Sequence, residues 1–224
     1  MIVSSPAILR CQGILFDMDG ILISSLGSVE RSWTKWAQLR GVDPAYAISV
    51  IHGRRAIDSV RSLRPDLDSE AELRILEDYE CADNDGLQVL PGVLHLLRAL
   101  PAHRWTVVTS ATERLARIRL AEGGVPVPPR LVTAETVQEG KPSPAPFLAG
   151  AALLGLAPQD CVVFEDSASG VQAGRAAGCT VVATTFSHEA EDLTAAHYLV
   201  EDLTGLTVQA GETGIELRFQ PIPR

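Results

Sequence analysis

The chain has 224 residues, of which 46% are hydrophobic and 21% charged, and its formal net charge is −9. This composition is typical of a globular protein and excludes the disordered and collagen-like classes. An acidic surface is unsuited to nucleic acid, so we expect no nucleic-acid partner. The four cysteines form no C-x-x-C pair, which favours free thiols in the cytoplasm over a zinc site or disulfides. No apolar run approaches the ~18 residues of a membrane span, and residues 1–12 lack the pattern of a signal peptide.

The first predicted element is a buried strand that ends at two carboxylates. The apolar run Ile14-Leu15-Phe16 leads into Asp17 and Asp19, and Gly20 ends it. A parallel strand delivers side chains in this way to the carboxyl edge of an open α/β sheet, where such sheets place their chemistry. The two aspartates would share one face of the strand and repel each other unless a cation lies between them or one holds a proton. A strand that simply enters an Asp-Gly turn is the structural alternative.

A block of helices without a convincing strand follows. Helical periodicity covers Ser28–Leu39, Ala45–Ile51, Ala56–Leu63 and Ser69–Ala82. A purely helical block that interrupts an α/β chain indicates an inserted domain. We therefore predict an all-helical domain over residues 26–88, inserted into a core formed by residues 1–25 and 89–224.

Helices and strands then alternate to the end of the core. The expected strands are Trp105–Thr109, Arg130–Thr133, Cys161–Phe164 and Thr180–Thr184, and the expected helices are Val93–Leu100, Glu113–Glu122, Pro144–Leu154 and Gly170–Ala177. This alternation predicts βαβ units and an α/β fold, with a parallel sheet covered by helices on both faces. A short strand at Tyr198–Val200 would extend one edge, while residues 210–224 fit either an extra strand or an irregular tail.

Polar side chains lie at three later positions where strands of this sheet would end. They are Thr109 and Ser110, Lys141, and the adjacent acids Glu165 and Asp166. Because parallel strands end side by side, these groups should converge with the two aspartates in one crevice. Taken singly, each has a structural alternative, such as a solvated lysine or a helix cap. Their occurrence together, each at a strand end, favours a functional site.

This set of groups suits a phosphate ester. Mg²⁺ prefers carboxylate and carbonyl oxygens, so Asp17, Asp166 and Glu165 suit it, together with a backbone oxygen near Asp19. Asp17 would attack phosphorus and carry the phosphoryl group as an acyl phosphate. Asp19 would protonate the leaving alcohol and later deprotonate water.

The remaining polar groups suit the phosphoryl oxygens. Lys141 and the hydroxyl of Ser110 or Thr109 would hold these oxygens, where negative charge builds in the transition state. The sequence therefore predicts a small-molecule phosphate ester as the partner of this site.

Four motifs resemble the signature motifs of the haloacid dehalogenase superfamily of aspartate-based phosphatases. They are Phe16-Asp17-Met18-Asp19-Gly20, Val108-Thr109-Ser110, Gly140-Lys141-Pro142-Ser143-Pro144 and Phe164-Glu165-Asp166-Ser167-Ala168-Ser169-Gly170. The resemblance implies a Rossmann-like core, magnesium and a mobile helical cap inserted after the first motif. It also implies roles for individual residues: Asp17 as nucleophile, Asp19 as acid/base, Ser110 (or Thr109) and Lys141 as phosphate ligands, and Asp166 with Glu165 as metal ligands.

The inserted block points to one branch of that superfamily. His52-Gly53-Arg54-Arg55 with Asp58 is similar to a His-Gly-x-Arg-x-x-Asp motif in glycerol-phosphate and deoxysugar-phosphate phosphatases. This resemblance implies that His52 and Arg55 bind substrate. The alternative is that both arginines are solvated or paired with Asp58. True dehalogenases of the superfamily lack the second aspartate of the first motif, so Asp19 favours phosphoryl transfer.

We therefore expect a cytoplasmic, magnesium-dependent phosphatase of small sugar or polyol phosphates, and among oligomeric states a monomer is favoured. A sugar phosphomutase of the β-phosphoglucomutase type would use the same core, and cap residues and water exclusion would separate the two. A non-catalytic binding protein on the same scaffold is a further alternative, although it would have kept every motif by coincidence.

Overall fold

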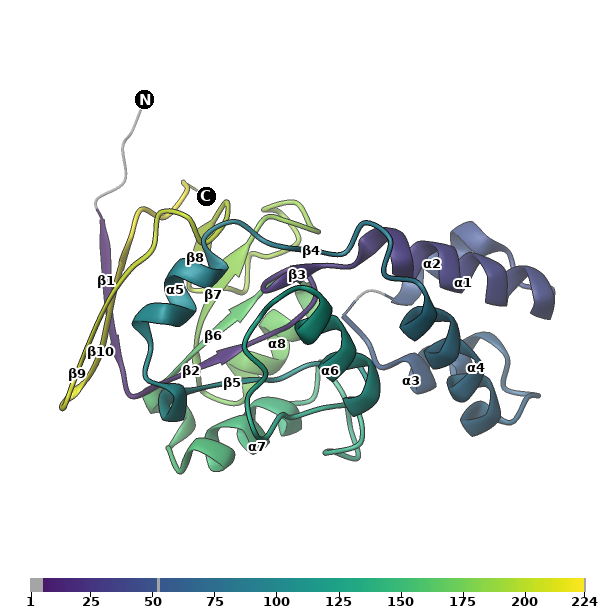
Figure 1. The fold of residues 1–224 in the computed structure, drawn as a ribbon, viewed down its shortest axis with the longest axis horizontal. Helices are drawn as coiled ribbons and strands as arrows, with labels where there is room; N and C mark the ends of the chain where they lie inside the picture. Colours follow the sequence, from purple (N-terminus) through teal and green to yellow (C-terminus); the bar gives the residue numbers. More distant parts are fainter. Residues whose placement is uncertain (1–5, 52, 224) are drawn as a thin grey trace.

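The computed structural model describes residues 6–51 and 53–223, and its centre is a five-stranded parallel sheet (Figure 1). The strand order is β5-β2-β6-β7-β8, and every neighbouring pair is parallel. The strands are β2 (Gly13–Phe16), β5 (Trp105–Val107), β6 (Cys161–Glu165), β7 (Thr180–Thr184) and β8 (Tyr198–Val200). The expected α/β class, the parallel sheet and the edge strand at Tyr198–Val200 are confirmed.

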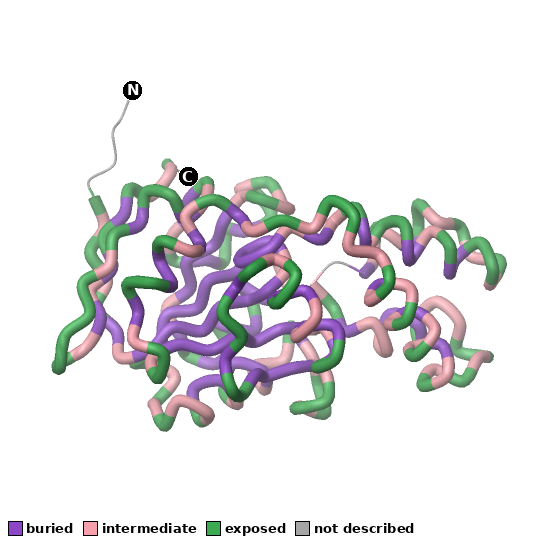
Figure 2. Tube along the Cα trace, viewed as in Figure 1, coloured by how far each residue is buried: buried purple, intermediate pink, exposed green. Residues whose placement is uncertain are grey.

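Helices cover both faces of this sheet. The helices are α5 (Val93–Ala99), α6 (Glu113–Glu122), α7 (Ala145–Leu154) and α8 (Ala168–Ala176), and short 3-10 turns, η1 (Ala102–Arg104) and η2 (Pro158–Asp160), lead into β5 and β6. Ile14 and Phe16 of β2 pack in one hydrophobic core with α5 and α6, whereas Leu15 packs in another with α7 and α8. Strands buried on both faces need a continuous apolar sequence. Figure 2 shows these strands as the buried centre of the molecule.

The strand expected at Arg130–Thr133 does not form. Only Val132 pairs with the sheet, through an isolated parallel bridge to Val108 just beyond β5. A stretch with three prolines, residues 125–129, precedes it, and proline cannot donate a hydrogen bond to a sheet ladder. On the other side the chain turns at once, because the N–H of Thr136 bonds to the carbonyl of Thr133. The pairing is therefore too short for a strand.

A second sheet joins the two ends of the chain. It is antiparallel, with the order β1-β10-β9, and its strands are β1 (Ala7–Cys11), β9 (Thr207–Gly211) and β10 (Gly214–Phe219). Ile215, Leu217 and Phe219 alternate along β10 and are buried in the same hydrophobic core as residues of α5. Most of the tail that the sequence left open is thus an edge hairpin, at the end of the molecule opposite the helical insertion (Figure 1).

The described residues of the inserted block form four helices between two short strands. Its helices are α1 (Leu26–Arg40), α2 (Pro44–Ile51), α3 (Ala56–Leu63) and α4 (Ser69–Ala82). The antiparallel pair β3 (Ile23–Ser24) and β4 (Gln88–Val89) lies where the chain leaves and re-enters the core. We call α1–α4 the cap. It has its own hydrophobic cluster, which includes Trp33, Trp36 and Leu76, but its behaviour as a separate domain stays a prediction.

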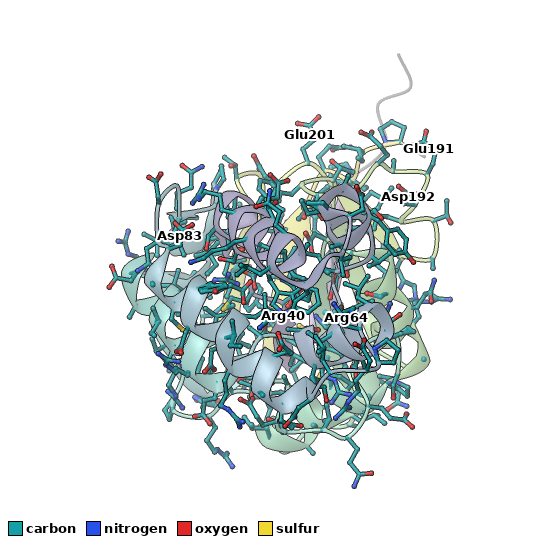
Figure 3. All side chains as sticks on the ribbon, turned by 90° about the vertical axis from the view of Figure 1, so that its right-hand side faces the viewer. Arg40, Arg64, Asp83, Glu191, Asp192 and Glu201 are labelled. Atoms are coloured by element: carbon teal, nitrogen blue, oxygen red, sulfur yellow. The ribbon has the colours of Figure 1, made fainter. Side chains whose placement is uncertain are left out.

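A buried carboxylate ties the cap helices together. Glu72 of α4 accepts hydrogen bonds from Trp36 Nε1 and from Arg40 Nε of α1, each at 2.8 Å. Arg64, after α3, donates in turn to the backbone carbonyl of Arg40. Figure 3 looks onto the cap and shows Arg40 and Arg64 near its centre. A buried carboxylate is stable only where hydrogen-bond donors surround it. Because the donors to Glu72 come from α1, these hydrogen bonds fix how α1 packs against α4.

The four cysteines are free thiols, and Cys11, Cys161 and Cys179 are buried. Within residues 6–51 and 53–223, none of the helices combines the length and the apolar character needed to cross a membrane.

Gly92 offers a test of how tightly the C-terminal segment packs on the core. It begins α5 with φ of 82°, and a Cβ there would overlap the backbone of Leu203 and Thr204. Gly155 has a similar φ of 72°, but nothing lies within 4 Å of its added Cβ. We expect Gly155→Ala to lower the free energy of unfolding by about 1 kcal/mol, the cost of a left-handed alanine. Gly92→Ala should cost roughly 3 kcal/mol or more, because overpacking adds to that strain. Urea unfolding measures both, and equal losses would contradict the packing described.

Candidate active site at the carboxyl edge of the sheet

Three carboxylates meet where β2 and β6 end side by side. Phe16 is in register with Phe164, so Asp17 and Glu165 leave the sheet as neighbours, and the N–H of Asp17 bonds to the carbonyl of Phe164. Oxygens of Asp17, Glu165 and Asp166 all lie within 4.8 Å of one another, and all three residues are buried. The predicted convergence of these acids at one edge is present in the structure.

Lys141 is a buried part of the same cluster. Its Nζ lies 3.0 Å from Asp17 Oδ1 and 2.6 Å from Glu165 Oε1, and the residue is only 4% exposed. The alternative of a solvated surface lysine therefore does not apply. Burial alone would lower the pKa of Lys141, but the charges of Asp17 and Glu165 raise it, so the side chain holds its proton.

Burial and charge divide the three acids into two kinds. Burial raises the pKa of Asp17 well above its ordinary value, although Lys141 opposes the shift. Burial, and then the charge of Glu165, raise the pKa of Asp166 to about 8. The pKa of Glu165 is lowered, because Lys141 and the N–H groups of Ser167 and Asp166 outweigh its burial. Lys141 thus pairs with two of the acids, but only Glu165 has a lowered pKa, and an added cation would stabilise the charged forms of Asp17 and Asp166.

The open oxygens of this cluster could hold a metal ion. Glu165 Oε1 faces Lys141, and its Oε2 accepts from the N–H groups of Asp166 and Ser167 and from the Ser167 hydroxyl. In contrast, the partners of Asp17 contact its Oδ1 and that of Asp166 contacts its Oδ2, so Oδ2 of Asp17 and Oδ1 of Asp166 accept no hydrogen bond from the described residues. Oxygen donors of this kind suit a hard divalent cation. Because both oxygens of Glu165 are already hydrogen-bonded, the geometry favours Asp17 and Asp166 as ligands over Glu165, which is the partner of Lys141.

A tight turn brings Asp166 against the first motif. Gly20 has φ of 80°, and a Cβ on it would overlap the carboxylate of Asp166. Only glycine combines that backbone conformation with so close an approach. The same oxygen of Asp166 that lies nearest to Gly20, Oδ2, accepts a hydrogen bond from the hydroxyl of Ser187 at 2.5 Å. Ser187 was not predicted, because its loop carries no motif.

Asp19 lies apart from this three-acid cluster. Its Oδ1 accepts hydrogen bonds from the hydroxyl of Ser25 at 2.5 Å and from Arg119 Nη1 at 3.2 Å. Strand β2 ends at Phe16, so the expectation that the two aspartates share one strand face is wrong, whereas the expected repulsion is present, because the charge of Asp19 raises the pKa of Asp17. The side chain of Asp19 does not join the predicted metal site, and the role suggested for its backbone oxygen stays a prediction.

Sequence reasoning missed Arg119 and its second partner, Glu80. Arg119 of α6 also contacts Glu80 of cap helix α4, and both are buried. Burial raises the pKa of Glu80 to about 7 even though Arg119 opposes the shift. One signal was present, since Arg119 follows Leu115 by four residues and so shares its buried helix face.

The two hydroxyls expected to bind phosphate lie beside the acids. Thr109 is buried, and its hydroxyl accepts from the N–H of Ala111. The hydroxyl of Ser110 donates to the carbonyl of Gly53 in the cap at 3.1 Å. Neither caps α6, because Thr112 does so through the N–H of Leu115. Both line the same cavity as Asp17, Asp19 and Asp166.

The cap closes over this cavity with Arg54 and not with Arg55. Arg54 is exposed and lines the cavity, as do Trp33 and Glu80. The guanidinium of Arg55 makes five hydrogen bonds: two to Asp58 and three to the carbonyls of Ala134, Val137 and Gln138. These use every donor that it has, and Arg55 does not line the cavity. The prediction that Arg55 binds substrate therefore finds no support here, and His52 lies outside the described residues.

Comparisons with known proteins agree with this geometry. A family model described as haloacid dehalogenase-like hydrolase matches residues 11–178. Hexitol phosphatase A of Escherichia coli (strain K12) is 41% identical over 211 residues, which cover 92% of this chain and 98% of that protein. Glycerol-1-phosphate phosphohydrolase 2 of Saccharomyces cerevisiae is 34% identical over 197 residues, which cover 82% and 79%.

The fold also matches that of solved structures. The crystal structure of a hydrolase from Pseudomonas syringae has a TM-score of 0.76 over 86% of this chain and 94% of that one, and at 22% identity it supports the fold alone. The family, and the branch, that the sequence motifs resemble are confirmed by the relatives above. The chain belongs to the haloacid dehalogenase-like hydrolase family.

Proposed function

We propose that this protein is a magnesium-dependent phosphatase that hydrolyses the phosphate monoester of a small polyol or sugar. The observation that carries the proposal is the buried carboxylate of Asp17, paired with Lys141 on one oxygen and open on the other, at the base of a cavity closed by the cap. The names of its relatives, a hexitol phosphatase and a glycerol-1-phosphate phosphohydrolase, support the substrate class.

The reaction has two steps that use the same carboxylate. In the first, an oxygen of Asp17 attacks phosphorus, the bond from phosphorus to the ester oxygen breaks, and the leaving alcohol takes a proton from Asp19. In the second, Asp19 takes a proton from water, whose oxygen attacks the same phosphorus. Inorganic phosphate leaves, and Asp17 is restored as a carboxylate.

The neighbouring groups stabilise the charge that moves in these steps. Lys141 lies against Asp17, where its ammonium would meet an oxygen of the phosphoryl group. The hydroxyls of Thr109 and Ser110 line the cavity beside it and would hold another. Negative charge develops on the phosphoryl oxygens in the transition state, and hydrogen-bond donors and cations stabilise it most strongly in a site that excludes water.

Mg²⁺ is the metal that we propose for the open oxygens of Asp17 and Asp166. When bound, it would neutralise carboxylate and phosphoryl oxygens and draw the two together. The set contains hard oxygen donors and no thiol or imidazole, which favours magnesium over a softer metal.

Substitution of the two aspartates tests the chemistry. With Mg²⁺, the wild-type protein should release inorganic phosphate from members of a panel of hexitol, glycerol and deoxysugar phosphates. Asp17→Asn should abolish release, and Asp19→Asn should slow it by about 10² to 10⁴, the range for a lost general acid/base. An isomerised sugar phosphate as product would indicate a mutase, and a phosphoryl group trapped on another side chain would exclude Asp17 as the nucleophile.

The pKa of Asp166 predicts how pH and metal affect stability. Its pKa is raised to about 8, so the folded protein keeps a proton there that the unfolded chain, with a pKa of about 4, releases. This contribution to the free energy of unfolding is complete below about pH 4 and is lost as the pH rises to about 8. In EDTA, the wild type should therefore lose stability relative to Asp166→Asn between about pH 5 and 8.

Added Mg²⁺ should reverse that loss in the wild type and have little effect on the variant. Denaturant unfolding across this pH range measures both effects. Parallel curves for the two proteins, or equal stabilisation by Mg²⁺, would mean that Asp166 is not a ligand.

The adjacent arginines Arg54 and Arg55 allow a matched test of which one binds substrate. Arg54→Ala should lower kcat/KM for a polyol phosphate by about 1–3 kcal/mol, the value of a charge-assisted hydrogen bond, with a smaller effect on p-nitrophenyl phosphate. Arg55→Ala should instead lower the Tm, because it removes five hydrogen bonds and leaves Asp58 unpaired. The assignment is reversed if Arg55→Ala gives the substrate-selective loss and Arg54→Ala does not.

A further inference from the structure

Arg119 is a buried arginine at the place where core and cap meet. It is 2% exposed, and its helix neighbours Leu115, Ala116 and Leu120 are buried apolar residues. A guanidinium in such surroundings is stable only with charged partners. Asp19 and Glu80, its two ion-pair partners in the part of the chain that the structure describes, come from the core and from the cap.

The two contacts use different nitrogens of the guanidinium. Nη1 lies 3.2 Å from Oδ1 of Asp19, in the core, and Nη2 lies 3.5 Å from Oε1 of Glu80, on cap helix α4. Nε is buried and has no hydrogen-bond partner among the described residues. Among the described residues, two carboxylates form ion pairs with Arg119, and removal of Glu80 would leave Asp19 as the one that remains.

The contact with Arg119 is one of two side-chain hydrogen bonds that Asp19 accepts from the described residues. Its side chain is 33% exposed in the cavity, and apart from Arg119 its carboxylate has the hydroxyl of Ser25 as a partner. A group that transfers protons must be held within hydrogen-bond reach of the reacting oxygen. Misplacement of a reacting group by about 1 Å can cost about 10² in rate.

We propose that Arg119 is a positioning residue for Asp19 and that Glu80 holds the guanidinium of Arg119 in place. The acid/base is then aligned only while α4 is docked on α6. The inference rests on the proposed phosphatase reaction and deepens it. It assigns to two residues outside the four sequence motifs a role in the step that protonates the leaving alcohol.

The chain offers a matched control in Arg114. This arginine also projects from α6 and also pairs with α4, through Glu77 at 3.0 Å and Asp78 at 2.6 Å. It is half exposed and makes no contact with Asp19 among the described residues. Arg114→Met therefore removes ion pairs between core and cap without altering the contacts of Asp19.

The test compares two esters that differ in their need for an acid. The alkoxide of an alkyl ester such as a hexitol phosphate is a poor leaving group that must be protonated as it departs, whereas p-nitrophenolate leaves without a proton. Arg119→Met should lower kcat/KM by about 10² for the alkyl ester and by less than about 5-fold for the aryl ester. Glu80→Gln should show the same selectivity with a smaller loss, and Arg114→Met should resemble the wild type on both.

The same substitution in a variant that lacks the acid/base provides a second test. In Asp19→Asn protein the acid/base is already absent, so adding Arg119→Met should cost little further activity on the alkyl ester. Arg119→Lys retains the charge without spanning both carboxylates, so it should show the selective loss if Arg119→Met fails to fold.

Equal losses on the two esters, an Arg114→Met variant as selective as Arg119→Met, or additive losses in the Asp19→Asn background would overturn the inference. A wild-type protein that releases phosphate from none of the esters would overturn the proposed function itself, and the inference with it. The two failures are thus distinguishable.

Discussion

The buried ammonium of Lys141 is the interaction on which the rest of the site depends. It lies between Asp17 and Glu165, where neighbouring parallel strands place two carboxylates in a medium that stabilises neither charge. Glu165 also accepts from two backbone N–H groups and from Ser167, so it is fixed and in turn fixes Lys141. The ammonium favours the charged form of Asp17, which is the form that attacks phosphorus.

Groups at strand ends could be predicted from sequence because the parallel topology itself brings them together. An apolar run before Asp17 and another before Glu165 were enough, since neighbouring parallel strands end at one edge. Partners from unrelated elements could not be predicted in this way. Arg119 meets Asp19 from 100 positions away, and its place on an apolar helix face indicated a buried charge without indicating the partner. The tail is similar, because the alternation in β10 suggested a strand while its partner β1 lies at the other end of the chain.

The neighbouring arginines of the cap show where a motif stops being informative. A matching sequence pattern favoured Arg55, but the chain turns at Gly53, and Arg55 directly precedes α3 with its side chain on the core loop over residues 134–138. That loop leads to Lys141, and a Cβ on Gly140 would press against Arg55. Arg55 therefore links the position of the cap to the loop that carries the buried ammonium. Such a contact is set by tertiary packing, which a short motif does not encode.

The distribution of charge in the cavity bears on the kind of ester that we propose it takes. The chain is strongly acidic, and Asp19 and Glu80 add carboxylates to the cavity wall, so an anion would be repelled unless these charges were paired. Arg119 pairs with both, which leaves Lys141 and the proposed metal at the base to attract the phosphate. The part of the cavity lining that comes from the cap then has one unpaired cation among the described residues, Arg54. It lies there with the paired Glu80 and the apolar side chain of Trp33. Hydrogen bonds to paired carboxylates suit neutral hydroxyls better than a second phosphate. This arrangement favours a monophosphate with an uncharged, hydroxylated leaving group over a bisphosphate.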